Sequence, residues 1–225
     1  MNTVYSMQSI DKTNLSEDVA DQIRGMITNG ALPAKSRINE VHLSEQLGIS
    51  RTPLREALAT LVAEGALESR PRKGNFVRPL TREEFESIYA IRPIHDVEAL
   101  RLSGIPNDEN LQRLIDLNEK LRHAQSLRTR ISRDDEWHLL LVQNCGNPIL
   151  LDLIRQFILR TRRYENAYLQ DMDNSSTAYE EHLKVIDALH NGDLKGACRA
   201  LKQNLTSGVE PILAWLDEFE GADGE

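Results

Sequence analysis

The sequence predicts a mainly α-helical chain in two domains, and three observations point to this arrangement. Apolar residues recur at the spacing of a helix face along most of the 225 residues. Aromatic residues, which favour strands, make up only 5% of the chain. A proline followed by a capping box, Pro79 and Thr81-x-x-Glu84, then separates a first domain at 10–79 from a second at 81–220.

The stretch 43–61 has the pattern of two helices joined by a tight turn. Leu43 and Leu47 are four residues apart and share one face of the first helix. Gly48 suits the end of that helix, and Ser50 is a favoured N-cap for the next one. The apolar face of the second helix is formed by Leu54, Leu58 and Leu61.

Two arginines occupy a different face at the start of the second helix. Arg51 and Arg55 are four residues apart, and Ser50 and Thr52 lie beside Arg51. A helix-turn-helix inserts its second helix into the DNA major groove with the N-terminal residues against the bases. We therefore expect these four residues to contact DNA, although the alternative, ordinary solvated arginines on a surface helix, stays open.

A short β-hairpin is expected after the helix pair. A helix over 15–29 precedes the pair, and strand-like runs follow it at 66–69 and 75–78. The turn between the strands holds Pro71, Arg72, Lys73 and Gly74. Three helices and a hairpin make a winged helix-turn-helix, and we expect Arg72, Lys73 and Gly74 to reach the DNA phosphates or the minor groove.

Charge is distributed unevenly between the two domains. The whole chain carries a net charge of −8, but residues 1–80 hold ten Lys or Arg against nine Asp or Glu. This argues against a uniformly basic nucleic-acid-binding protein and assigns DNA contact to the first domain. The two cysteines are too few for a disulfide framework, and no run is long and apolar enough to span a membrane, so we expect a cytoplasmic protein.

The second domain is expected to be an all-α bundle of six helices. Their predicted ranges are 82–103 with a kink near Pro93, 108–126, 132–144, 147–169, 176–190 and, from 193, a last helix ending near 204 or running beyond Pro211 with a kink. Polar residues interrupt the apolar faces of three of these helices. They are Asp134 and His138, four residues apart, with His182 and Asn204 on two other helices.

Burying these polar groups without partners would cost several kcal/mol, so they are expected to meet one another, a metal or a ligand. Arg92 is expected to face the same cavity, where its planar fork suits a carboxylate. A surface ion pair is the alternative role for Arg92.

These segments resemble the GntR family of bacterial transcription regulators, of the FadR type with an FCD ligand-binding domain. The N-terminal resemblance is carried by Ser50-Arg51-Thr52-Pro53-Leu54-Arg55-Glu56-Ala57-Leu58, Glu64-Gly65 and Pro71-Arg72-Lys73-Gly74. The C-terminal resemblance is carried by Ile88-Tyr89-Ala90-Ile91-Arg92, Asp134-x-x-x-His138, Cys145-Gly146-Asn147-Pro148 and Glu181-His182-Leu183-Lys184-Val185-Ile186.

The resemblance implies a homodimer that binds a pseudo-palindromic operator in double-stranded DNA and responds to a small effector, often a carboxylate metabolite. We expect it to act as a repressor. It carries DNA contact over to Arg51, Arg55 and the turn at 72–74. It also implies one divalent metal ion of the zinc or nickel class, held by Asp134, His138 and His182. Asn204 stands where the third histidine of that site is expected, so it is at most a weak fourth ligand.

The main alternative is a metal-dependent small-molecule enzyme or binding protein with an appended helix-turn-helix. A third hypothesis is that the protein is a protein-interaction module. The sequence lacks a nucleophile elbow, a Gly-rich phosphate loop and a redox cysteine pair, so we expect no catalytic residue and no enzymatic activity.

Overall fold

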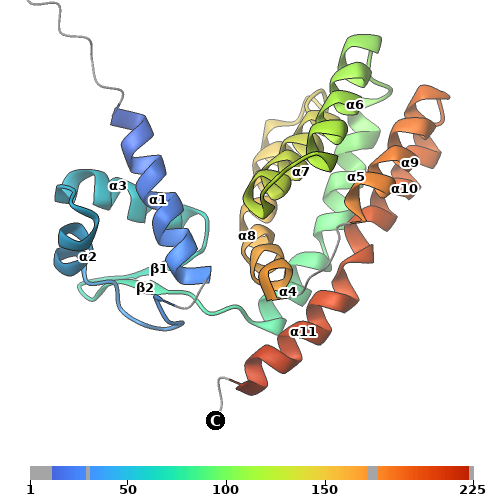
Figure 1. Cartoon of the computed structure of the whole chain (residues 1–225). Helices are drawn as coiled ribbons and strands as arrows, with labels where there is room; N and C mark the ends of the chain where they lie inside the picture. Colours follow the sequence, from blue (N-terminus) through green and yellow to red (C-terminus); the bar gives the residue numbers. More distant parts are fainter. Residues whose placement is uncertain (1–11, 29–30, 172–176, 223–225) are drawn as a thin grey trace, which may run out of the picture. The chain divides into compact units, whose positions relative to one another are not determined.

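A computed structural model describes residues 12–28, 31–171 and 177–222 (Figure 1). The contacts divide the chain into two compact units, with the division between Pro79 and Leu80. Residues 10 and 11, the start of the predicted first domain, lie outside the described residues, as do residues 29 and 176 at two predicted helix ends.

The first unit has the expected order of three helices and a hairpin. Its elements are α1 (Lys12–Thr28), α2 (Glu40–Leu47), α3 (Arg51–Ala63), β1 (Leu67–Arg70) and β2 (Gly74–Val77). The predicted apolar face of α3 is confirmed, because Leu54, Leu58 and Leu61 are each at most 1% exposed. They pack in one cluster with apolar residues of α1 and α2.

The turn between α2 and α3 is built as the sequence suggests, with one difference. The side chain of Asn39 accepts the N–H groups of Val41 and His42, which fixes the start of α2. Gly48 ends that helix with a left-handed φ of 66°, a conformation that glycine adopts without strain. Ser50 has the extended backbone of an N-cap, but its side chain makes no capping hydrogen bond.

The hairpin pairs antiparallel, with Arg70 opposite Gly74 and three residues in the loop. Each strand is shifted by one residue from the predicted range. Arg72 at the loop tip has a φ of 62°, and Gly74 has a φ of 92°. A residue with positive φ is typical of three-residue hairpin loops.

The second unit is entirely helical within the described residues, but it has eight helices and not six. They are α4 (Arg82–Tyr89), α5 (Arg92–Ser103), α6 (Asp108–Arg122), α7 (Leu127–Val142), α8 (Pro148–Asp171), α9 (Ala178–His190), α10 (Leu194–Ser207) and α11 (Val209–Ala222).

Two of the predicted helices are divided, and in both cases a proline lies just after the break. A proline lacks the N–H and clashes with the carbonyl four residues earlier, whereas the first turn of a helix tolerates it. The expected kink near Pro93 is therefore a break, and α5 starts one residue before the proline. Similarly, α11 begins at Val209, so Pro211 lies in its first turn. A third difference is that α7 starts at Leu127 and not at residue 132, because the Ser126 side chain caps it by accepting the N–H of Thr129.

Six helices of the second unit, α5 to α10, enclose its main apolar core. Trp137 on α7 and Ile154 on α8 are fully buried in this core. A smaller cluster joins α4, α8 and α11 around Phe85, Tyr164 and Leu216. In Figure 1, α9 and α10 run side by side and α11 leads away from them.

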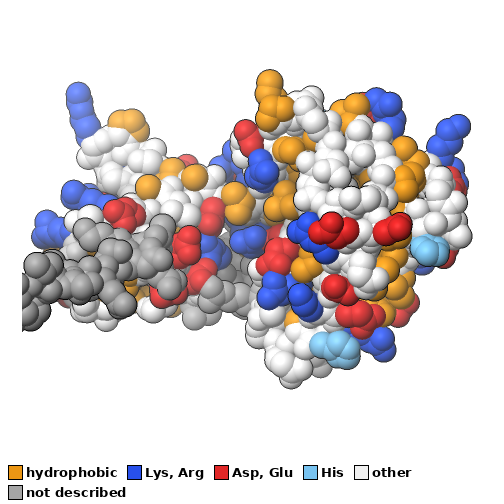
Figure 2. All heavy atoms as spheres, turned by 90° about the horizontal axis from the view of Figure 1, so that it is seen from above, with side chains coloured by type: hydrophobic (Ala, Val, Ile, Leu, Met, Phe, Trp, Pro, Cys, Tyr) orange, Lys and Arg blue, Asp and Glu red, His pale blue; other side chains and the backbone are white. Residues whose placement is uncertain are grey.

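The surface of the second unit is mixed in character. Figure 2 shows acidic and basic side chains interspersed over the face in view, with hydrophobic side chains reaching the surface between them. No helix among the described residues has both the length and the apolar character that crossing a lipid bilayer requires.

Candidate functional site

The N-terminal end of α3 presents the predicted DNA-contacting residues to solvent. Ser50, Arg51, Thr52 and Arg55 are all exposed, while Leu54 between them is fully buried. The buried leucine anchors the helix, so the arginines are held on its outer face. Arg55 is not free in this arrangement, because its Nε donates to Oε2 of Glu40 on α2 at 3.0 Å.

The hairpin turn presents a second group of basic residues. Arg72 and Lys73 are exposed at its tip, as predicted, and Gly74 is partly buried. Sequence patterns did not indicate Arg37, which precedes α2, pairs as an isolated bridge with Phe76 and lies beside Gly74. Because its partners are more than 35 residues away, no local pattern could have associated Arg37 with the hairpin.

The second unit contains a cavity of about 450 Å³ that is lined by four of the five predicted effector-binding residues. They are Arg92, Asp134, His138 and Asn204. The fifth, His182, is 0% exposed and lies against Asp134. The lining also includes polar residues that the sequence did not suggest, namely Tyr89, Arg130, Glu165 and Glu181.

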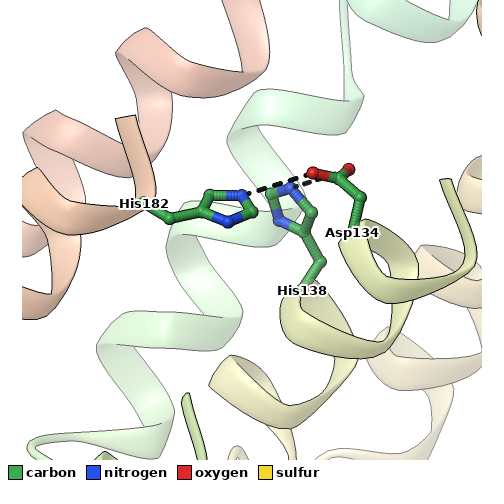
Figure 3. Close-up of side chains that lie close together, drawn as sticks. All are labelled: Asp134, His138 and His182. Carbon is green, nitrogen blue, oxygen red and sulfur yellow. Dashed lines mark ion pairs between the residues drawn. The ribbon is translucent and has the colours of Figure 1, made fainter. Parts of the chain in front are cut away.

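Three of the predicted ligands converge at one point (Figure 3). His138 Nε2 lies 3.7 Å from Oδ2 of Asp134 on the same helix, and His182 Nε2 reaches Oδ1 of Asp134 from α9 at 3.4 Å. One atom from each residue lies within 4.8 Å of the other two. Zinc binds nitrogen and oxygen ligands at roughly 2.0–2.2 Å, so two ligands of one ion are separated by about 3–3.5 Å. The two distances to Asp134 are close to this range, so the three residues could hold a small divalent ion.

The tautomer of His182 is set by a residue that the sequence did not suggest, Asn118 on α6. The amide nitrogen of Asn118 donates to the carbonyl of Tyr179 at 3.1 Å, which turns its oxygen toward His182 Nδ1 at 3.0 Å. Nδ1 therefore carries the proton and donates it, and Nε2 presents its lone pair to Asp134. Metal-binding histidines are typically oriented in this way. Trp137 stacks on the His182 ring, with 3.6 Å between ring centroids, and holds it in place.

The electrostatic state of the cluster also suits a cation. Burial lowers the pKa of His182 to about 3, and burial, with the neighbouring His182 and Arg92, lowers the pKa of His138. Both imidazoles are therefore neutral near pH 7, which is the form that binds metals. Burial, together with the charges of Glu165 and Asp135, raises the pKa of Asp134 well above its usual range. A positive charge beside Asp134 would offset the cost of ionising it.

Asn204 lies on the wall of the same cavity. Its amide nitrogen donates to Oε2 of Glu181 at 2.9 Å, and Ser207 donates to the same oxygen at 3.0 Å. Several buried atoms at this site have no hydrogen-bond partner among the described residues, among them Arg92 Nε, Asp134 Oδ1, His182 Nε2 and Asn204 Oδ1.

Arg92 is 3% exposed, so the alternative of a surface ion pair is wrong. Its Nη1 donates to Oγ1 of Thr161 on α8 at 2.7 Å. Carboxylate oxygens of Asp96 and Glu165 lie 3.7 Å from its guanidinium. Although burial opposes the charge, the nearby oxygens of Tyr89, Asp96 and Glu165 raise the pKa of Arg92. The guanidinium is therefore a fixed positive charge on the cavity wall.

One helical turn further along α8, Tyr164 contacts the beginning of the second unit. Its hydroxyl accepts the N–H of Thr81 at 3.2 Å and donates to Oε2 of Glu84 at 2.8 Å. Arg163 pairs with the same Glu84 oxygen at 2.9 Å. A short stretch of α8, residues 161–165, thus contacts both the cavity residue Arg92 and the N-terminus of α4.

Comparison with known proteins agrees with this architecture. Residues 15–77 match the family described as bacterial regulatory proteins, gntR family, and residues 87–207 match the FCD domain. The transcriptional regulator YdhC of Bacillus subtilis is 29% identical over 88% of this chain and 91% of its own length. A putative L-lactate dehydrogenase operon regulatory protein of Escherichia coli is 30% identical over 91% of this chain and 88% of its own.

The fold has a close counterpart among solved structures. The E. coli protein McbR/YncC is 26% identical, has a TM-score of 0.70, and is matched over 93% of this chain and 99% of its own. These relatives are transcription regulators and not enzymes, so the metalloenzyme alternative is not supported. The chain belongs to the GntR family of DNA-binding transcription regulators, with a gntR-type winged helix-turn-helix followed by an FCD domain.

Proposed function

We propose that the protein is a homodimeric repressor whose affinity for a pseudo-palindromic operator changes when a small effector enters the cavity of the FCD domain. The observation that carries this proposal is the composition of the cavity. It has a volume of about 450 Å³ and is lined by Arg92, Asp134, His138 and Asn204. Such a volume is in the range of small-molecule sites. As a regulator of DNA, the protein is inferred to act in the cytoplasm.

The DNA contacts follow from the exposed end of α3 and the hairpin. Arg51 and Arg55 read base edges in the major groove, with Ser50 and Thr52 beside them. Arg72, Lys73 and Gly74 place the hairpin tip against the phosphates or in the minor groove. A dimer repeats this set of contacts on the second half-site.

The effector is proposed to be a carboxylate metabolite. Arg92 offers a guanidinium held by Thr161, and a guanidinium matches the two oxygens of a carboxylate. One relative is named for an L-lactate dehydrogenase operon, and lactate is a small hydroxy carboxylate. This likeness supports the chemical class but does not identify the molecule.

The metal site is proposed to hold one divalent ion of the zinc or nickel class through Asp134, His138 and His182. The fit rests on the unpaired lone pairs of Asp134 Oδ1 and His182 Nε2. When bound, the ion would supply a second positive charge for an effector carboxylate. Asn204 Oδ1 is available as a weak fourth ligand, since an amide oxygen binds such ions less well than imidazole does.

Replacing Asn204 with histidine is expected to strengthen metal binding. Imidazole is a better ligand for zinc and nickel than an amide oxygen, so the Asn204→His variant should bind zinc at least about tenfold more tightly. Competition against a chromogenic chelator measures this affinity. Asn204→Gln, which keeps an amide, is the matched control, and an unchanged affinity in Asn204→His would show that position 204 does not reach the ion.

Dimerisation is supported by apolar side chains on the surface of the FCD domain. Ile91 and Ile94 at the start of α5, and Leu102 and Ile105 at its end, are between 41% and 65% exposed. Burying such residues against a second copy would remove apolar area from water. Sedimentation of the full chain, with Ile94→Glu as the test variant, measures the assembly.

Effector binding is proposed to reach the DNA-binding domain through α8. Arg92 contacts Thr161, and Tyr164 on the next turn holds the N–H of Thr81, where the FCD domain begins. A shift of α8 on effector binding would therefore move Thr81. This is allostery only if the effector has different affinities for the arrangements of α8 and Thr81 before and after the shift.

Replacing Tyr164 with phenylalanine tests this route. The change removes the hydroxyl that holds Thr81 and Glu84 and leaves the fully buried ring in place. Losing these hydrogen bonds should cost about 1–3 kcal/mol of stability. Effector affinity and operator affinity, each measured alone, should stay near wild type. The change in operator affinity that the effector causes should become smaller. If the effector changes the operator affinity of Tyr164→Phe as much as that of wild type, this route is excluded.

The experiment that tests the function is a binding assay with the region upstream of the protein's own gene, followed by a thermal-shift screen of organic acids and amino acids with and without zinc. A regulator should bind that DNA specifically and should be stabilised by at least one compound. A reporter fused to the same region then gives the sign of regulation. Absence of any sequence preference in DNA binding would contradict the proposal.

A further inference from the structure

The two arginines of α3 have different surroundings, although they are one helical turn apart. Arg55 is paired through Nε with Oε2 of Glu40 at 3.0 Å. Arg51 makes no ion pair within the part of the chain that the structure describes. An acidic side chain beside a DNA-contacting arginine is unexpected on a surface that approaches phosphates, because it repels them.

The position of Glu40 is itself well fixed. It is the first residue of α2, whose first turn is held by the Asn39 cap at 3.2 Å to the N–H groups of Val41 and His42. The next turn of α2 packs on α3 through Leu43, which is 3% exposed. The side chain of Glu40 is 29% exposed, whereas that of Arg55 is 66% exposed.

The pair has little value as a stabilising contact. Ion pairs between exposed side chains contribute little to stability, because water and salt screen them. Its geometry is more informative. A guanidinium has five N–H donors in a rigid fork, and Glu40 engages the one on Nε. The two terminal amino groups make no hydrogen bond within the described residues, so they remain available, and they form an edge that can bind O6 and N7 of guanine.

We propose that Glu40 is a specificity-determining residue, which orients Arg55 so that its terminal amino groups read one guanine in each half-site. The inference rests on the proposed contact between Arg55 and DNA. Without Glu40, Arg55 would sample several rotamers, and its charge would be free to turn toward phosphates. Removing Glu40 should therefore reduce discrimination between bases without reducing general attraction to DNA.

The test is selection of binding sequences from random duplex DNA by the full chain, with Glu40→Gln, Arg55→Ala and wild type in parallel. Arg55→Ala identifies the base position that Arg55 reads. At that position Glu40→Gln should reduce the preference for the favoured base about three- to tenfold, a fraction of what a bidentate contact provides. Affinity for an unrelated duplex, measured at several salt concentrations, should be unchanged or stronger.

Glu45→Gln is the matched control, because it removes the same charge from an exposed position of the same helix. It should leave the selected sequence unchanged. Glu40→Asp, with a shorter side chain, should give an intermediate loss, and thermal melting of each variant monitors folding.

Three outcomes would overturn the inference. If Arg55→Ala loses the base preference and Glu40→Gln keeps it, Glu40 does not orient Arg55, while the proposed DNA contact stands. If Glu40→Gln weakens binding to all duplexes alike, Glu40 only supports the fold. If Arg55→Ala leaves the selected sequence intact, the contact itself fails and the inference with it.

Discussion

Replacing Arg51 or Arg55 with alanine is expected to abolish specific operator binding and leave the protein folded. Both side chains are exposed, so their loss removes no core packing. A bidentate arginine–guanine contact provides about 1–3 kcal/mol of discrimination, and a dimer loses it in both half-sites. The specific affinity should therefore fall by a factor on the order of 10² or more.

Footprinting on the selected operator measures this loss. Arg155→Ala is the control, because Arg155 is an exposed arginine of the FCD domain that pairs with the nearby Asp152. It should protect the operator as wild type does. Normal footprints from both the Arg51 and the Arg55 variants would refute the assignment of α3 as the reading helix.

Removing the metal is expected to lower the melting temperature of the wild-type protein. A ligand at 100 times its Kd stabilises the folded state by about 2.7 kcal/mol. For a domain of this size that corresponds to a shift of roughly 5–10 °C. Chelation should produce this shift in protein purified without a nickel column, and adding zinc back should reverse it.

His182→Gln should no longer respond to the chelator, because it lacks the ligand nitrogen that faces Asp134. His190→Gln, an exposed position at the end of the same helix, should respond as wild type does. Asn118→Ala keeps all three ligands but frees the His182 ring, and such changes typically weaken metal binding 10- to 100-fold. A metal content that is unaffected by His182→Gln would show that the ion binds elsewhere.

The sequence was most informative where function depends on short spacings. Arg51 and Arg55, and Asp134 and His138, are each four residues apart, and helix geometry alone places such pairs on one face. The structure confirms a buried stripe opposite the arginines and a shared cavity for the polar residues. That His182 and Asn204 meet Asp134 was expected from the cost of burying polar groups and from the family resemblance, since spacing along the chain says nothing about which helices meet.

What the sequence could not provide depends on long-range contacts. Asn118 orients His182 from 64 residues away, and Tyr164 holds Thr81 from 83 residues away. Neither residue belongs to a local motif. The helix count was wrong for a different reason, because a proline near a helix start and a proline in a kink give the same sequence pattern, and tertiary packing decides between them.

The central claim is that an effector in the FCD cavity controls operator affinity. The most direct measurement is the operator affinity of the full chain at one salt concentration, with and without the metabolite that most stabilises the protein. The proposal predicts a change of at least about fivefold, and operator DNA should change the metabolite's affinity by the same factor. A metabolite that binds among Arg92, Asp134 and His138 and leaves operator affinity unchanged would contradict it.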